Sequence, residues 1–113
     1  MTPHLVPRAH ATLHADGMSI DYVRAGRGDT VVILCIGGGE DPPVQPLIER
    51  LALDHRVIVP TLPSDDSFPV ALDNLLEGIG VCTVGLVAVE EFGRLAREFT
   101  ASRPGRVSSL VTL

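Results

Sequence analysis

The chain has 113 residues, of which 45% are hydrophobic, and it combines nine arginines with 14 acidic residues for a formal net charge of −5. This length suits one domain with a single core, and the hydrophobic content excludes an intrinsically disordered protein. The negative charge and the lack of a basic stripe argue against nucleic acid as a partner. No apolar run is long enough to span a bilayer and the N-terminus carries no export signal, so we expect no association with a membrane.

The two cysteines indicate the cellular compartment. Cys35 and Cys82 are expected near opposite ends of their strands. That separation exceeds the roughly 7 Å between α-carbons that a disulfide tolerates. Reduced thiols without an export signal predict a cytoplasmic protein. We expect residues 1–8 to form a loose N-terminal arm and residues 9–113 to form a single domain.

A β-hairpin opens the predicted fold. Its strands cover residues 11–14 and 18–23, and an Asp-Gly pair between them is a strong hairpin turn signal. Residues 30–36 then form a continuous apolar run, which is typical of a central parallel strand covered on both faces. This run ends in three consecutive glycines, at residues 37–39.

Helices alternate with further strands in the rest of the chain. The apolar residues of the helices recur every three or four positions, and the strands are short apolar runs. In chain order we expect a helix over 45–54, a strand over 57–60, a helix from Ser67 to Gly78, a strand over 84–88, a helix from Glu91 onward and a strand over 107–113. A hairpin followed by repeated strand–helix units predicts an α/β fold with three αβα layers and a mostly parallel sheet of about six strands.

Several short segments, in their order and spacing, resemble parts of one known fold. They are 31–34 for a third strand, 35–39 for a loop of oxyanion-binding donors, 46–52 and 55–63 for a helix and a fourth strand, and 84–86 and 101–111 for the nucleophile turn and a sixth strand. Together they resemble the N-terminal half of the α/β-hydrolase fold, from about Ala11 to Leu113. The resemblance implies a catalytic acid and a histidine beyond the sixth strand, where this sequence has no residues.

The turn after the strand at 84–88 is where the family carries its nucleophile elbow, Gly-x-Ser-x-Gly, because the strained nucleophile needs small neighbours. Here Ala88 meets the first small position, Glu90 stands at the nucleophile position and Phe92 stands at the second small position. Phe92 breaks the requirement for a second small neighbour, and Gly93, one step later, relieves the crowding only if the turn relaxes, so the sequence leaves the geometry of the elbow open. Glu90 is either a carboxylate nucleophile or a solvent-facing side chain that the helix dipole stabilises by about 0.3–1 kcal/mol.

Two features beside the elbow have both a chemical and a structural interpretation. The backbone N–H groups of Gly37 and Glu91 are candidates for an oxyanion-like donor pair, but a plain glycine turn also explains residues 37–39. A reactive Cys35 would need a nearby cation to lower the pKa of its thiol, and His55 is expected at the opposite end of the sheet. We therefore interpret Cys35 as a small apolar residue.

Six carboxylates follow the C-terminal ends of strands, which is the edge of an open α/β sheet where ligands bind. This acidic rim consists of Glu40, Asp41, Asp65, Asp66, Glu90 and Glu91. Such a cluster suits Mg²⁺, Ca²⁺ or a basic partner, although polar loops explain it equally and no metal-ligand spacing is present. Without a bound cation, mutual repulsion is expected to raise the pKa of some of these carboxyls. We predict no cofactor and assign no metal ligand.

These features favour a catalytically inactive α/β-hydrolase-like binding or assembly module, which lacks a serine nucleophile and a catalytic histidine. The alternative is a hydrolase-like or lyase-like enzyme that uses Glu90 or is completed by residues of a second chain. Residues 107–113 are expected to form an open sheet edge, which invites pairing with another copy of the chain. We therefore expect a homodimer through this edge, with its small-molecule ligand unknown.

Overall fold

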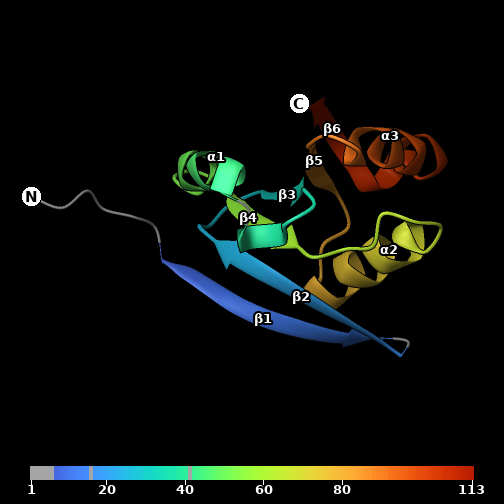
Figure 1. Cartoon of the computed structure of the whole chain (residues 1–113), viewed down its shortest axis with the longest axis horizontal. Helices are drawn as coiled ribbons and strands as arrows, with labels where there is room; N and C mark the ends of the chain where they lie inside the picture. The colour runs from blue at the N-terminus through green and yellow to red at the C-terminus, as the bar shows by residue number, and fades with distance from the viewer. Residues whose placement is uncertain (1–6, 16, 41) are drawn as a thin grey trace, which may run out of the picture.

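A six-stranded sheet forms the centre of the computed structural model, which describes residues 7–15, 17–40 and 42–113 (Figure 1). Its strands are β1 (Arg8–Ala15), β2 (Met18–Ala25), β3 (Thr30–Leu34), β4 (Arg56–Pro60), β5 (Val84–Ala88) and β6 (Val107–Thr112). Their order across the sheet is β1-β2-β4-β3-β5-β6. The pairs β1–β2 and β2–β4 are antiparallel, whereas β4, β3, β5 and β6 run parallel. The predicted α/β class, with a hairpin that opens a mostly parallel sheet, is confirmed.

Three α-helices cover the two faces of this sheet and complete the predicted αβα layers (Figure 1). They are α1 (Gln45–Leu51), α2 (Phe68–Ile79) and α3 (Phe92–Ser102), with short 3₁₀ turns η1 (Gly38–Glu40), η2 (Pro42–Val44) and η3 (Pro104–Arg106). Helix α1 packs on one face, and α2 and α3 pack on the other. Within the described part of the chain, no helix has both the length and the hydropathy needed to cross a membrane.

The core is divided by the sheet into two clusters. On the face of α2 and α3, the ring of Phe68 lies 5.7 Å from that of Phe92 and 6.3 Å from that of Phe99, measured between centroids. All three rings are almost fully buried, and each such burial contributes about 1.5–3 kcal/mol. On the other face, Val44 and Ile48 bring α1 onto β3 and β4. The three phenylalanines therefore fix α3 and the turn that precedes it.

Two element boundaries differ from the predicted ones because the chain turns earlier. The strand predicted to reach residue 36 ends at Leu34, since the N–H of Gly38 bonds to the carbonyl of Cys35 at 3.3 Å. The helix predicted over 45–54 ends at Leu51, whose carbonyl accepts from the N–H of Asp54 at 3.3 Å in a tighter turn.

Two further boundaries, the end of α2 and the start of β1, also differ from the predicted ones. Helix α2 passes the predicted Gly78 and ends at Ile79, and the next residue, Gly80, has the left-handed φ of 78° that terminates helices. Arg8, which was assigned to the N-terminal arm, belongs to β1: it pairs with Ala25, and its guanidinium donates to the Gln45 side chain. The rest of the predicted arm, apart from Pro7, lies outside the described residues.

Candidate functional site

The turn from β5 into α3, residues 88–93, is the elbow of this fold. Glu90 has a φ of 58° and is the single non-glycine residue with a positive φ in the described ranges. Its N–H bonds to the carbonyl of Leu113 at 3.4 Å, and its carbonyl accepts from the N–H of Gly93 at 3.0 Å. A left-handed residue with a side chain costs about 1–2 kcal/mol, so these flanking bonds hold a strained conformation in place.

Phe92 does not force this turn to relax. The Phe92 side chain is 2% exposed and lies in the core against Phe68, so it points away from the strained backbone. Ala88 is fully buried at the other small position. A Cβ on Gly93 would meet Thr112 at 3.7 Å, an ordinary contact, so Gly93 is not needed to relieve crowding. The sheet and the phenylalanine core together preserve the elbow without the second small residue.

Glu90 and Glu91 are exposed and line a pocket of about 410 Å³ beside the start of α3. The remaining lining residues are Ser64, Gly93, Arg94, Leu95, Arg97, Thr112 and Leu113. We call this space the elbow pocket. A carboxylate raised above the sheet at the end of a helix that carries partial positive charge is presented to any ligand that enters. Chemically, such a carboxylate can act as a nucleophile, a base or an anchor for a cation.

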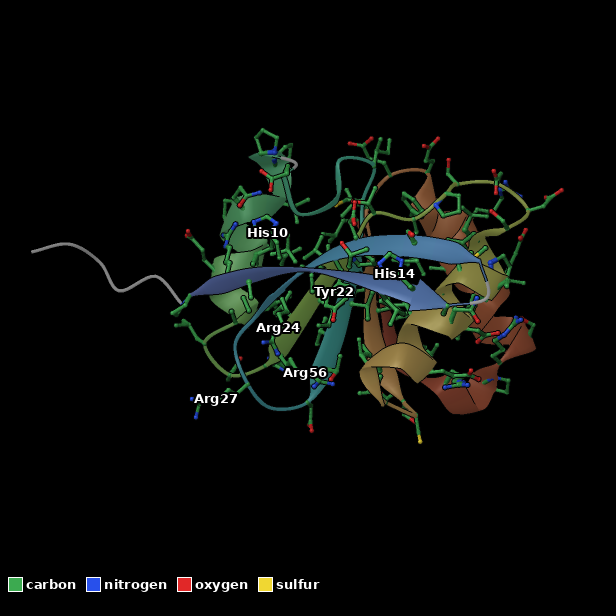
Figure 2. All side chains as sticks on the ribbon, turned by 90° about the horizontal axis from the view of Figure 1, so that it is seen from below. His10, His14, Tyr22, Arg24, Arg27 and Arg56 are labelled. Carbon is green, nitrogen blue, oxygen red and sulfur yellow. The ribbon has the colours of Figure 1, made fainter. Side chains whose placement is uncertain are left out.

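No histidine of the described residues is close to the elbow in the fold. His10 and His14 lie along β1, at the sheet edge far from β5 (Figure 2). His55 directly precedes β4 and bonds to Asp54 at 2.7 Å, at the opposite end of the parallel strands from Glu90, as predicted. His4 lies outside the described residues. Glu90 therefore has no base from a described histidine to activate a water molecule.

Packing explains the glycine run after β3. Gly38 has a φ of 59°, and a Cβ there would lie 2.5 Å from Thr61 Oγ1. A Cβ on Gly39 would lie 2.3 Å from a methyl carbon of Val23. Gly37 is exposed, and its pairing with the Glu91 N–H as an oxyanion-like site stays a prediction. The two glycines that follow it are needed so that the loop can pack on β2 and on the end of β4.

Cys35 is 2% exposed, and its Sγ donates to the carbonyl of Gly38 at 3.2 Å. Cys82 is exposed, and neither cysteine forms a disulfide. The buried position of Cys35 agrees with its interpretation as a small core residue at the end of a strand.

The described carboxylates of the acidic rim lie at the hairpin and in two adjacent hollows that share Ser64, Arg94 and Leu95. Glu40 faces the hairpin, where its Oε1 lies 3.8 Å from His10 Nε2, and Glu90 and Glu91 line the elbow pocket. Asp65 and Asp66 line the adjacent hollow of about 300 Å³ near Glu98. Asp41 lies outside the described residues. Among residues that are described, no three His, Cys, Asp or Glu side chains are grouped to hold a metal ion. Binding of a cation or basic partner by the whole rim stays a prediction.

Asp65 differs from the predicted rise in rim pKa values. The hydroxyl and the N–H of Ser67 both donate to Asp65 Oδ1, at 2.5 and 2.9 Å. These bonds favour the charged form and lower the pKa of Asp65 below 3.8. The Ser67 hydroxyl therefore holds Asp65 in the loop, and the Ser67 side chain makes no capping hydrogen bond to α2.

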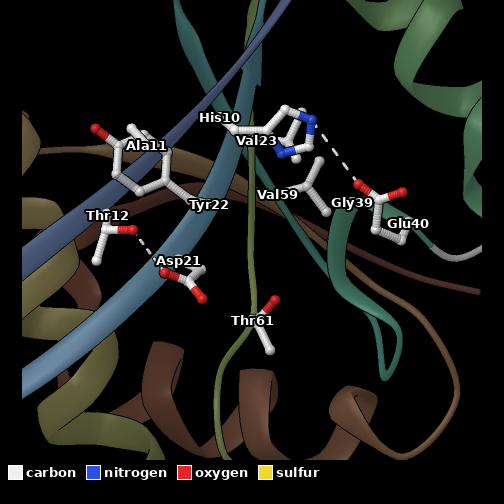
Figure 3. A pocket seen from close by; sticks show the side chains of 10 residues that line it. All are labelled: His10, Ala11, Thr12, Asp21, Tyr22, Val23, Gly39, Glu40, Val59 and Thr61. Atoms are coloured by element: carbon white, nitrogen blue, oxygen red, sulfur yellow. Dashed lines mark hydrogen bonds and ion pairs between the residues drawn. The ribbon is translucent and has the colours of Figure 1, made fainter.

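A polar groove on the hairpin, shown in the close view of Figure 3, was not predicted from the sequence. It has a volume of about 390 Å³ and is lined by His10, Ala11, Thr12, Asp21, Tyr22, Val23, Gly39, Glu40, Val59 and Thr61. Thr12 Oγ1 donates to Asp21 at 2.7 Å across the hairpin, as their register allows. The alternation of the hairpin strands was the available signal, since it places Thr12 and Asp21 on one face. Because its main polar groups bind one another, the groove has less capacity for a ligand than the elbow pocket.

Comparison with known proteins identifies the fold. No protein-family model and no curated protein matches the sequence. Among solved structures, the chain is similar to the epoxide hydrolase CorEH, with a TM-score of 0.81 and 22% identity over 94% of this chain and 42% of that one. Cfl2 from Burkholderia cenocepacia matches with a TM-score of 0.79 and 24% identity, covering 99% and 45% of the two chains.

A third similar structure is the epoxide hydrolase VrEH1 from Vigna radiata, with a TM-score of 0.80 and 20% identity. The match covers 93% of this chain and 39% of VrEH1. The chain thus spans less than half the length of these proteins. It has the fold of the first half of an α/β-hydrolase, as the sequence resemblance predicted.

Proposed function

We propose that this chain is the nucleophile-bearing half of an α/β-hydrolase-fold enzyme and has no turnover on its own. The retained strain at Glu90 is the observation that carries the proposal. A φ of 58° at a residue with a side chain persists where the surroundings enforce it, and such strain is concentrated at functional sites. A glycine would fill the same turn without strain, and it would present no carboxylate.

The names of the similar structures suggest the chemistry. Two of the three are epoxide hydrolases, and a carboxylate nucleophile suits that reaction. A Glu90 oxygen would attack a ring carbon of the epoxide, the carbon–oxygen bond of the ring would break, and the freed oxygen would take a proton from an acid. Water would then attack the carbonyl of the resulting ester while a base accepts its proton, releasing a diol and restoring the Glu90 carboxylate.

The acid and the base of these steps belong, in this proposal, to a second polypeptide segment that covers the elbow pocket. The positions of His10, His14 and His55, far from the elbow, support this assignment. The isolated chain is therefore expected to form the ester slowly and to be unable to hydrolyse it.

Intact mass spectrometry after incubation with styrene oxide tests this function. We expect one added epoxide per chain in the wild-type protein and in Glu91→Gln, which removes the neighbouring carboxylate of the same pocket. Glu90→Gln should carry no adduct at the elbow. An adduct that survives in Glu90→Gln, or a wild-type chain that never reacts, contradicts the proposal.

Generic esterase activity is expected to be absent, because position 90 offers no hydroxyl or thiol. Purified wild-type protein and Glu90→Ala should both leave short-chain activated esters unhydrolysed. Turnover in the wild-type protein that Glu90→Ala abolishes would show that the carboxylate serves a complete hydrolase site within this chain.

A non-catalytic assembly module is the second candidate, and the exposed end of β6 favours it. Val111 of β6 is 48% exposed, and Leu113, directly after the strand, is 66% exposed; β6 pairs only with β5 among the described strands. Open apolar edges invite pairing, and a two-fold homodimer would bury this one. We also propose a cytoplasmic location, which the two cysteines support because they do not form a disulfide.

Light scattering on Val111→Lys tests the assembly. A charge on the edge strand should convert a wild-type dimer to a monomer. The control is Val70→Lys, which places the same charge on α2 at a valine that is 51% exposed, and it should remain dimeric. A wild-type chain that is monomeric at micromolar concentration removes the homodimer from consideration.

A further inference from the structure

Arginines gather at the end of the sheet opposite the elbow. A groove of about 560 Å³ there is lined by Pro7, Arg8, Ala9, Arg24, Ala25, Gly26, Arg27, Gly28 and Arg56. We call it the arginine groove. It holds four of the nine arginines of a chain whose net charge is −5. No carboxylate is among its described lining residues, so this surface is positive on an otherwise acidic protein.

Strand pairing brings these arginines together from distant parts of the sequence. Arg24 of β2 lies opposite Ile58 of β4, and Arg56 is two residues from Ile58 on the same face. Arg56 is half-buried, and its Nε donates to Thr30 Oγ1 at 3.0 Å. Figure 2 shows Arg24, Arg27 and Arg56 on the same side of the hairpin, at the end where β4 begins.

The turn that carries Arg27 is held by a close backbone contact. Gly26 has a φ of 82°, and a Cβ there would lie 2.2 Å from the carbonyl oxygen of His55 and 2.6 Å from that of Ala52. No side chain fits in that space, so the turn lies directly on the segment between α1 and β4. The side chain of Arg27 therefore extends from a backbone position that is held in place at the rim of the groove.

Two of these guanidinium groups have their hydrogen-bonding capacity available. Arg24 and Arg27 are exposed, and their guanidinium groups make no hydrogen bond or ion pair with any described residue. Arg8 differs, since its guanidinium contacts Gln45 and lies 3.7 Å from Glu49 of α1. The groove thus presents two free planar donor groups beside the half-buried cation of Arg56.

We propose that the arginine groove binds a small, multiply charged phosphate, with the pyrophosphate group as its model. Guanidinium forks bind phosphate oxygens in bidentate pairs, and neighbouring free arginines suit a ligand with charge on two adjacent centres. The volume is within the range of small-molecule sites. An extended polyanion is disfavoured, because beyond the groove it would meet the net negative charge of the chain.

Calorimetric titration of the full chain with sodium pyrophosphate tests the site. Arg24→Gln and Arg27→Gln should each weaken binding by about 10-fold, and the double variant should abolish it. The matched control is Arg50→Gln, which removes an exposed arginine of α1 without a described partner and should bind like the wild-type protein. Orthophosphate should bind more weakly than pyrophosphate, and added salt should weaken both.

The proposal is overturned if pyrophosphate gives no heat at millimolar concentration, or if Arg50→Gln loses as much affinity as the groove variants. Binding to anionic phospholipid vesicles without binding of pyrophosphate would also overturn it, in favour of a membrane surface. Arg24 and Arg27 are exposed, so their variants should fold, and circular dichroism confirms this before titration. The site lies at the opposite end of the sheet from Glu90, so the adduct experiment neither supports nor weakens it.

Discussion

The two ends of the parallel sheet use left-handed backbone in different ways. At the elbow, Glu90 has a φ of 58° and keeps an exposed carboxylate there, at the cost of strain. At the arginine groove, Gly26 has a φ of 82° and carries no side chain, because the carbonyl of His55 occupies the space. The Gly26 turn therefore has no room for a side chain. Position 90, by contrast, carries a glutamate side chain, although glycine would adopt the same backbone conformation without strain.

Gly26→Ala tests the packing side of this comparison and has the largest expected effect. A Cβ at a left-handed residue that also clashes with two carbonyl oxygens should destabilise the fold by about 2–5 kcal/mol. Gly80→Ala is the matched control, since Gly80 has a φ of 78° and no atom within 4 Å of the added Cβ. It should lose only about 1–2 kcal/mol. Urea unfolding measures both, and equal losses would show that the close contact at Gly26 carries no energy.

Strain at the elbow predicts that Glu90→Gly is more stable than Glu90→Ala by about 1–2 kcal/mol. The reason is that glycine adopts a φ of 58° without steric cost. The same pair of substitutions at Arg94, an exposed residue inside α3, should have the opposite sign, with glycine worse than alanine by about 1 kcal/mol. Unfolding curves that rank alanine above glycine at position 90 would mean that the elbow is relaxed in solution.

The smallest expected effect concerns Asp65, in the loop after β4 at the elbow end. Because the folded pKa of Asp65 is lowered, its contribution to stability is present above its ordinary value of 3.8. That contribution is lost as the pH falls through the lower folded pKa. Ser67→Ala removes the hydroxyl donor and should move the pKa of Asp65 back toward 3.8. A carboxyl NMR titration that finds no difference between wild-type protein and Ser67→Ala would contradict this cause.

Much of the fold could be predicted from the sequence because its signals are local. The strand over Val84–Ala88 has the bounds that the apolar run predicted, and the helix after it begins one residue beyond Glu91. The two hairpin strands pair as predicted up to Ala15 and Met18, and Asp16 of the predicted turn lies outside the described residues. The predicted ends of β3 and α1 were less accurate, because these elements stop earlier, at Leu34 and Leu51. The backbone hydrogen bonds that turn the chain there are not indicated by any particular residue type.

The α/β class, the strand–helix order and the place of Glu90 at a turn follow from local patterns, because apolar periodicity and turn residues act within a few positions. The strain in that turn depends on tertiary packing, since Phe92 has to reach Phe68 across the core. Tertiary packing also brings arginines from β2, its following turn and β4 into one groove. Both outcomes depend on pairing between distant segments, and residue spacing along the chain does not encode which side chains meet in space.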